Sequence, residues 1–176
     1  QAKVAADLPE GQSDPTQVVI RREGGLEDDE WAEHTGGLRV EEVHGDTYNA
    51  YVMLIRDPAR VYLSPSSKSY SKSRPGTRIT KQIETEGAVA AINGGAFFDN
   101  GTISPEVGSV PCGLVVSRGE VLWNDGSSYY GFAGFNEDDI LVVSKKMSAA
   151  EAKEARIRDG CCYGPVLIKD SAVNEE

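Results

Sequence analysis

Short hydrophobic runs, often alternating with polar residues, recur along most of the chain and are separated by turn-forming residues. This pattern predicts half-buried β-strands. Gly45-Asp46 and Arg118-Gly119 lie between successive runs and are typical of hairpin turns, so the flanking runs should pair antiparallel. The first three runs should form an antiparallel meander. The predicted strands cover residues 38–43, 48–55, 60–64, 113–117, 120–123, 129–135, 140–143 and 164–168.

One further apolar run, residues 88–92, stops abruptly at Asn93-Gly94-Gly95 and is followed by two aromatic residues and Asp99. An apolar run that ends in glycines predicts a buried strand leading into a turn. Gly94 and Gly95 permit positive φ and a close approach by a ligand or another chain segment. The stretch is therefore either a binding site, with polar atoms from Asn93 and Asp99, or a plain strand–loop connection capped by Asn93.

Two helices are expected from their end signals. The first runs from Thr77, a candidate N-cap, to Glu86, and Gly87 provides its C-terminal stop. The second opens at Ser148-Ala-Ala-Glu151, which has the pattern of a capping box, and should extend to about Arg158.

Many short strands with few helices predict an α+β fold, mainly antiparallel β-sheet with two or three helices. A chain of 176 residues has the size of one domain and buries about two-thirds of its unfolded surface. We expect a polar N-terminal segment over residues 1–37 and a single domain over residues 38–176. The N-terminal segment contains one short apolar run, residues 18–20, which we expect to form a strand or arm.

Charge and hydropathy narrow the range of partners. The formal net charge of −10 argues against nucleic acid or an anionic membrane surface, because the long-range field would repel both. No run approaches the roughly 20 apolar residues of a membrane span, and the first residues have neither a basic nor an apolar leader region. We therefore expect no nucleic-acid partner and no membrane span in this chain.

Cysteine usage leaves two alternatives. Cys112, Cys161 and Cys162 form an odd set without Cys-x-x-Cys spacing, and the chain has only two histidines, which argues against zinc. On a strand, Cys161 and Cys162 would point to opposite faces, so at most one would reach Cys112. The sequence allows either a single disulfide to Cys112 or three buried free thiols.

The candidate chemical groups are carboxylates and amides, because the chain has no Gly-x-Ser-x-Gly elbow, Walker loop, dinucleotide fingerprint or His-Glu-x-x-His motif. Asp99 follows a glycine turn and two aromatic residues, where a carboxylic acid can act as general acid or base. Asp99 and Asn93 could also bind a hard cation such as Ca²⁺, but two ligands do not make a metal site. The sequence requires no cofactor, and spacing alone identifies no second catalytic carboxylate.

Three motifs in order give a resemblance to a known family. The segments Ala91–Asp99, Pro111–Gly119 and Gly164–Ile168 resemble successive motifs of the phosphodiester glycosidase family. This is the family of the lysosomal uncovering enzyme, which removes N-acetylglucosamine from a phosphodiester on mannose. Tyr51–Val61 also resembles the strand pair that precedes these motifs in Gram-positive bacterial members. The resemblance extends from about residue 48 to residue 170.

The resemblance implies hydrolysis of a sugar-1-phosphodiester on a cell-envelope glycopolymer, such as a teichoic acid, outside the cytoplasmic membrane. By matching position, it implies that Asp99 and Asn93 are catalytic and that Gly94 and Gly95 line the cleft floor. Gly164-Pro165 would then shape the opposite wall. An asparagine amide can hold a sugar hydroxyl or a phosphate oxygen, and glycine N–H groups can donate to the phosphate.

Two further family segments do not occur before Glu176: an arginine-containing segment and a later Asp-Gly-Gly motif. In family members these follow the Gly-Pro strand and would supply an arginine for the phosphate and an acid. The sequence therefore leaves two main hypotheses, besides the alternative of an unrelated acidic β-rich extracellular domain. The chain is a phosphodiester glycosidase completed by a C-terminal segment of the same protein, or it is a non-catalytic carbohydrate-binding or structural module of the cell envelope.

Overall fold

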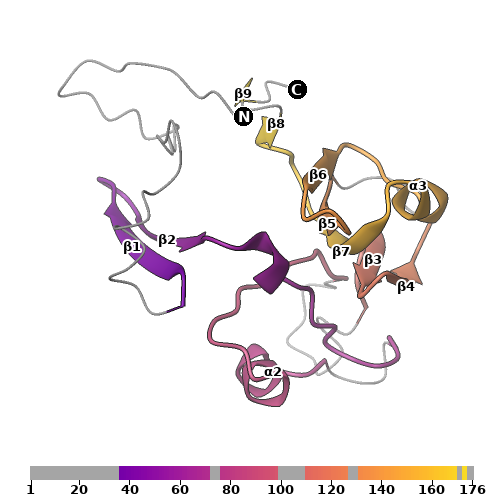
Figure 1. Cartoon of the computed structure of the whole chain (residues 1–176), viewed down its shortest axis with the longest axis horizontal. Helices are drawn as coiled ribbons and strands as arrows, with labels where there is room; N and C mark the ends of the chain where they lie inside the picture. Colours follow the sequence, from indigo (N-terminus) through magenta and orange to yellow (C-terminus); the bar gives the residue numbers. More distant parts are fainter. Residues whose placement is uncertain (1–35, 72–75, 99–109, 127–130, 170–171, 174–176) are drawn as a thin grey trace. The chain divides into compact units, whose positions relative to one another are not determined.

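The computed structural model describes residues 36–71, 76–98, 110–126, 131–169 and 172–173 (Figure 1). It confirms an α+β fold dominated by antiparallel sheet. The chain divides into a first unit, Gln1–Arg60 with Ile168–Val173, and a second unit, Val61–Leu167 with Asn174–Glu176. The domain boundary expected at residue 37 stays a prediction, and the strand or arm expected at residues 18–20 lies outside the described residues.

The first unit is built on a β-hairpin, as predicted. The turn is closed by the Gly45 N–H, which donates to the carbonyl oxygen of Tyr48 at 2.8 Å. A two-stranded ladder of two short strands belongs to the same unit. The elements are β1 (Leu38–His44), β2 (Asn49–Ile55), the 3₁₀ turn η1 (Pro58–Arg60), β8 (Ile168–Lys169) and β9 (Ala172–Val173).

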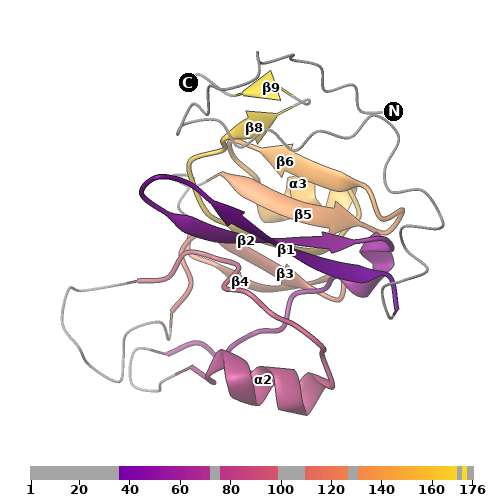
Figure 2. The same ribbon diagram turned by 90° about the vertical axis from the view of Figure 1, so that its left-hand side faces the viewer.

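The second unit contains a five-stranded antiparallel sheet in the order β4-β3-β7-β5-β6. Its strand β7 is labelled in Figure 1, and the other four are labelled in Figure 2. The expected β3–β4 hairpin forms, and the two strands predicted after it also form and pair as β5–β6. Arg118 and Gly119 in the first of them have φ of 53° and 79°, as a tight hairpin turn with two left-handed residues requires. The strands are β3 (Leu114–Ser117), β4 (Glu120–Asn124), β5 (Phe132–Asn136), β6 (Leu141–Ser144) and β7 (Ile157–Cys162).

The core of the second unit lies between this sheet and helix α3 (Ala149–Glu154). The predicted capping box opens the helix: Ser148 Oγ accepts from the Glu151 N–H at 3.2 Å, and the Ser148 N–H donates to Glu151 Oε2 at 2.7 Å. This exchange satisfies two backbone donors at the helix start. The buried core residues are Leu114, Val116, Phe132, Ala152, Ile157 and Cys162.

The expected extension of this helix to Arg158 is wrong. The helix ends at Glu154, Arg156 has φ of 54°, and residues 157–162 form β7, the central strand of the sheet. The left-handed Arg156 breaks the helical path and turns the chain into the strand. Gly160 in β7 is paired with Gly134 in β5, so neither strand places a side chain there.

Replacing Gly160 by alanine should lower the free energy of unfolding by about 1–3 kcal/mol. A Cβ at this position would lie 2.4 Å from Cζ of Phe132 and 2.9 Å from Cα of Gly134. Because Phe132 is fully buried, its ring cannot move into solvent. Urea unfolding would measure the effect. Gly94→Ala is the matched control, since its Cβ would make an ordinary contact, 3.4 Å from Cys161 Sγ. An unchanged unfolding midpoint for Gly160→Ala would contradict the prediction.

The predicted strand at residues 60–64, and with it the three-stranded meander, is wrong. Side chains bind the backbone of this segment in place of a neighbouring strand. The Leu63 N–H donates to Asp159 Oδ1 at 3.2 Å, and Ser117 Oγ donates to the carbonyl oxygen of Leu63 at 2.7 Å. These bonds satisfy the polar groups of Leu63 without a β-ladder.

The predicted buried strand at residues 88–92 is also wrong. Residues 88–92 form no strand, and the side chains of Val89 and Ile92 are 77% and 79% exposed. The chain meets the sheet only afterwards, where the Ala96 N–H donates to the carbonyl oxygen of Cys162 at 2.8 Å. Apolar composition alone did not decide burial here, because no neighbouring strand among the described residues pairs with this run.

Of the predicted strand at residues 164–168, only Ile168 lies in a strand, β8. The preceding residues are irregular and include the cis Gly164-Pro165 bond. Proline has no N–H to donate to a β-ladder, which disfavours a regular strand at this point.

The predicted first helix forms as α2 (Ile79–Glu86), and Gly87 ends it with φ of 63°, as expected. Its N-cap is Arg78 rather than Thr77, and no side chain caps it. The Thr77 carbonyl oxygen instead accepts from Gln82 Nε2 at 2.8 Å. None of the helices in the described ranges is long and apolar enough to cross a membrane.

Candidate functional site

The candidate site is the glycine turn, residues 93–95, which lies against the C-terminal end of β7. A Cβ on Gly95 would be 3.2 Å from Cys161 Cβ, and one on Gly94 would be 3.4 Å from Cys161 Sγ. The backbone of the turn therefore packs directly on a cysteine side chain. The close approach predicted for the two glycines is therefore found at Gly95, where the approaching group is another segment of the chain; the contact at Gly94 is an ordinary one, and neither glycine has a positive φ.

A short antiparallel ladder holds the residues that leave the turn. The Cys112 N–H donates to the Ala96 carbonyl oxygen at 2.9 Å, and the Phe98 N–H donates to the Val110 carbonyl oxygen at 2.8 Å. The Ala96 N–H points the other way and donates to the Cys162 carbonyl oxygen of β7. The turn thus leads into a fixed stretch of backbone between β7 and residues 110–112.

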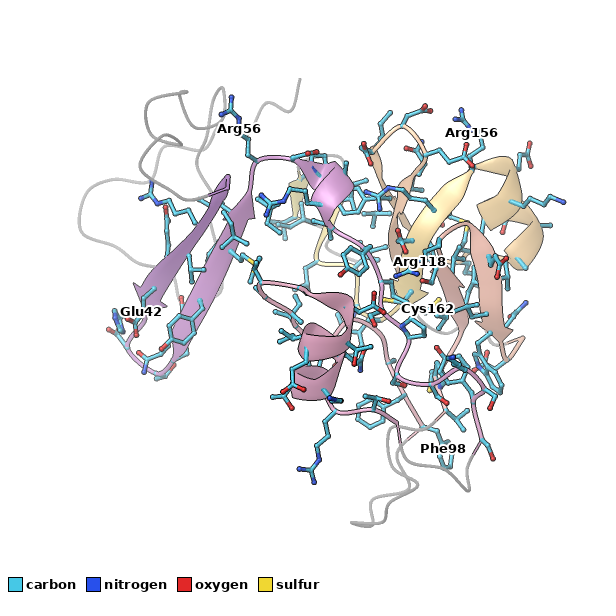
Figure 3. All side chains as sticks on the ribbon, turned by 60° about the horizontal axis from the view of Figure 1, so that its bottom comes forward. Glu42, Arg56, Phe98, Arg118, Arg156 and Cys162 are labelled. Atoms are coloured by element: carbon cyan, nitrogen blue, oxygen red, sulfur yellow. The ribbon has the colours of Figure 1, made fainter. Side chains whose placement is uncertain are left out.

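Gly113 forms a second close contact with β7 beside this ladder. It has φ of 75°, and a Cβ there would lie 2.7 Å from Cys162 Cβ. Its N–H donates to Asp125 Oδ2 at 2.8 Å, and the next N–H, of Leu114, donates to Cys162 Sγ at 3.2 Å. Cys162 is labelled in Figure 3. These bonds fix the start of β3 against the end of β7, where the glycine turn is also attached.

The residues of the turn are largely exposed. Within the described part of the chain, Asn93, Gly94 and Gly95 make no hydrogen bond through N–H, C=O or amide groups. Asn93 and Gly94 are exposed, and Gly95 is half-buried. Fixed, unoccupied N–H groups beside an exposed amide suit an anionic or hydroxyl-bearing ligand.

The other predicted site residues are placed only in part. Gly164-Pro165 begins two residues after Cys162, so the fold brings it to the same end of β7 as the turn. Asp99 lies outside the described residues, and its predicted role stays a prediction. Phe98, which precedes it, is held by its bond to Val110. The catalytic and binding roles of all these residues are predictions that the geometry alone does not test.

The thiol beneath the turn is kept neutral by its surroundings. No disulfide forms among the three cysteines. Cys161 lies on the sheet beside Val115, which is paired in turn with Trp123. Burial among these groups, with a smaller contribution from neighbouring Cys162, raises the pKa of Cys161 to about 11. Burial also raises the pKa of the adjacent Tyr70 hydroxyl, so both groups are protonated at neutral pH.

Alkylation of Cys161 by iodoacetamide should be about a hundredfold slower at pH 8 than that of an ordinary thiol, because only the thiolate reacts. The rate should keep rising with pH up to about 11, the raised pKa of Cys161. Since the folded pKa lies above the unfolded value, this thiol stabilises the fold below about pH 9 and loses that contribution as the pH rises to 11. Mass-spectrometric labelling, with guanidinium-unfolded protein as control, would measure the rate. Equal rates for folded and unfolded protein would contradict the neutral thiol.

A buried polar cluster on the same strand was missed by sequence reasoning, which placed residues 158–160 at the end of a helix. Asp159 is only 6% exposed and accepts from the Arg158 guanidinium at 2.8 Å. Arg158 also donates to the Val61 carbonyl oxygen at 2.7 Å and pairs with Asp139 at 2.9 Å. These contacts attach the segment after residue 60 to β7. Their role is to position backbone, because every polar group involved is already bonded within the protein.

No group of three or more histidine, cysteine, aspartate or glutamate side chains that could hold a metal ion occurs among the described residues. His44, one of the two histidines, is a surface residue hydrogen-bonded to Asn49 at 2.8 Å.

Comparison with protein families gives a match to the phosphodiester glycosidase model over residues 86–176, slightly more than half of the chain. This chain belongs to the phosphodiester glycosidase family. The match begins at the end of α2 and includes the glycine turn, β7 and Gly164-Pro165. No curated protein and no solved structure matches the chain.

Family membership confirms the resemblance found in the sequence motifs. It indicates a hydrolase related to glycosidases that act on carbohydrate phosphodiesters. The strand-pair resemblance at Tyr51–Val61 lies before the matched range and stays a prediction. The sugar, the polymer and the activity of this chain belong to the proposal below.

Proposed function

We propose that this protein hydrolyses the bond between a sugar and phosphate in a sugar-1-phosphodiester. The observation that carries the proposal is the set of N–H groups at residues 93–95 that have no partner among the described residues, together with the exposed Asn93 amide, all on a turn packed against β7. A phosphodiester presents anionic oxygens to such N–H groups, and a sugar presents hydroxyls to the amide. The family match over the same residues supports this choice of substrate.

In the proposed reaction, water attacks the anomeric carbon and the C1–O bond breaks. The products are the free sugar and a phosphate monoester, so the electron pair of the broken bond leaves with the phosphate oxygen. Asp99 would exchange the proton with water or with the leaving oxygen. Main-chain N–H groups of Gly94 and Gly95 would stabilise the departing phosphate.

The natural substrate in this proposal is a glycopolymer or glycoconjugate of the cell envelope, and the site of action is outside the cytoplasmic membrane. The negative net charge of −10 does not assist long-range attraction of a polyanionic polymer. Recognition would then depend on short-range contacts at the turn, and the affinity for a single repeat should change little with salt.

The test uses the methyl phosphodiester of N-acetylglucosamine 1-phosphate in water enriched in ¹⁸O. The proposed reaction places the ¹⁸O atom in the released sugar, because water attacks carbon. Label in the phosphate would instead indicate phosphodiesterase chemistry and would reject the glycosidase assignment. Binding without turnover by the intact protein would favour the alternative of a non-catalytic carbohydrate-binding module.

A further inference from the structure

Tyr163 is an exposed aromatic residue at the same end of β7 as the glycine turn. Its side chain is 64% exposed, so it contributes little to the core. Its N–H donates to the Gly131 carbonyl oxygen at 2.8 Å, directly after the paired residues Phe132 and Cys162. The ladder between β5 and β7 therefore continues to Tyr163, and the backbone position of this residue is fixed.

The pleat of the strand determines which face carries the tyrosine ring. Cys162 points into the core, so its neighbours Cys161 and Tyr163 both project from the opposite face. Cys161 is the residue on which Gly94 and Gly95 pack. Two positions along a strand span roughly 7 Å. The pleat therefore directs the Tyr163 side chain to the face that carries the candidate site, two positions along the chain from the cysteine on which the turn packs.

An exposed tyrosine in this place matches the chemistry of a sugar ring. One face of a pyranose consists of C–H groups with slightly positive hydrogens, and the face of an aromatic ring is slightly negative. Stacking buries apolar surface on both partners while the tyrosine hydroxyl stays in water. The Asn93 amide and the glycine N–H groups of the turn can form hydrogen bonds with the hydroxyl and phosphate oxygens of the same ligand.

We propose that Tyr163 is the sugar platform of the site and determines its preference for a pyranose-bearing phosphodiester. This inference rests on the proposed function. In this arrangement the turn at Gly94-Gly95 receives the phosphate, and the ring of Tyr163 receives the adjacent sugar. Tyr163 positions the substrate and takes no part in proton transfer.

The test compares Tyr163→Ala, Tyr163→Phe and Tyr163→Trp with the wild-type protein, using the methyl phosphodiester of N-acetylglucosamine 1-phosphate. Loss of the ring should raise KM about tenfold and change kcat less than about twofold, because stacking acts on substrate binding. The two aromatic variants should keep KM within about threefold of the wild type. Tyr51→Ala is the matched control, since Tyr51 is 71% exposed and lies in the β1–β2 hairpin.

Saturation-transfer NMR with the same probe separates this inference from the proposed function, with dimethyl phosphate as the sugar-free control. If the wild type binds the probe without turnover and Tyr163→Ala loses that binding, the glycosidase assignment is rejected, but the role of Tyr163 as the sugar platform is supported. A wild-type affinity or KM in Tyr163→Ala overturns the platform, whether or not the protein is active. Failure of the wild type to bind the probe also overturns it. Circular dichroism and urea unfolding establish that each variant is folded.

Discussion

Replacement of Asp159 by alanine should lower the free energy of unfolding by about 3–5 kcal/mol, the usual cost of removing one partner of a buried charged pair. Oδ1 of Asp159 accepts from the N–H groups of Leu63 and Arg118 at 3.2 and 3.1 Å. Oδ2 pairs with Arg158 at 2.8 Å. The variant leaves two backbone donors without this acceptor and leaves the Arg158 guanidinium with Asp139 as its remaining carboxylate partner among the described residues. Urea unfolding with a constant m-value would measure the loss.

Two variants make this stability experiment specific. Asp159→Asn keeps one acceptor oxygen and should lose less stability than Asp159→Ala. Asp138→Asn removes an exposed carboxylate that pairs with Arg156 at 3.2 Å, and such surface pairs contribute about 0–1 kcal/mol. If Asp159→Ala and Asp138→Asn unfold at the same urea concentration, the buried cluster does not stabilise the fold as described.

Asp99→Asn should reduce phosphodiester cleavage at least about a hundredfold, as expected when a general acid or base is lost. The prediction rests on the position of Asp99 in the family motif, directly after the ladder that holds Phe98. An amide is close in size to the carboxylic acid but cannot exchange a proton at neutral pH. The intact protein and the methyl phosphodiester probe would measure kcat and KM, and the loss should fall on kcat.

Asp138→Asn also serves as the control for activity, because it changes the charge equally at an exposed position outside the site. It should retain wild-type turnover. Turnover of Asp99→Asn near the wild-type value would reject Asp99 as the acid or base. Unfolding curves that coincide for the two variants would show that lost activity does not reflect lost structure.

The sequence predicted those elements whose signals are local. The capping box at Ser148 and the hairpin turn at Arg118-Gly119 each specify structure within a few residues, and both form as expected. The left-handed stop at Gly87 is a third such signal. In each case backbone geometry and nearby hydrogen bonds are enough to fix the element, so its residues carry the necessary information.

The errors concern elements whose structure depends on distant partners. The first two residues of β7, Ile157 and Arg158, were assigned to the end of a helix, although the pairing of β7 with β3 and β5 makes it the centre of the sheet. Residues 88–92 were assigned to a buried strand because they are apolar, yet Val89 and Ile92 are exposed. A local sequence pattern specifies neither the order of strands in a sheet nor whether another strand lies beside a given run.

In the candidate site, too, the sequence predicted the local features and missed those that depend on distant segments. The sequence identified the glycine turn and Gly164-Pro165 separately, and the structure brings both to the end of β7. The sequence did not indicate that Cys161 lies beneath the turn, since this contact follows from the register of β7. Once that strand is known, alternation along it places Cys161 and Tyr163 on one face.

The attachment of Leu63 to β7 also affects which substitutions the chain can accept. The groups bound there are the N–H and carbonyl oxygen of Leu63, which any residue other than proline would supply. The specificity lies instead in the side chains of Ser117 and Asp159, which are 54 and 96 positions further along the chain. We therefore expect variation at position 63 to be tolerated in natural sequences more readily than variation at positions 117 and 159. The path of the backbone at Leu63 therefore depends on side chains in other segments of the chain rather than on its own side chain.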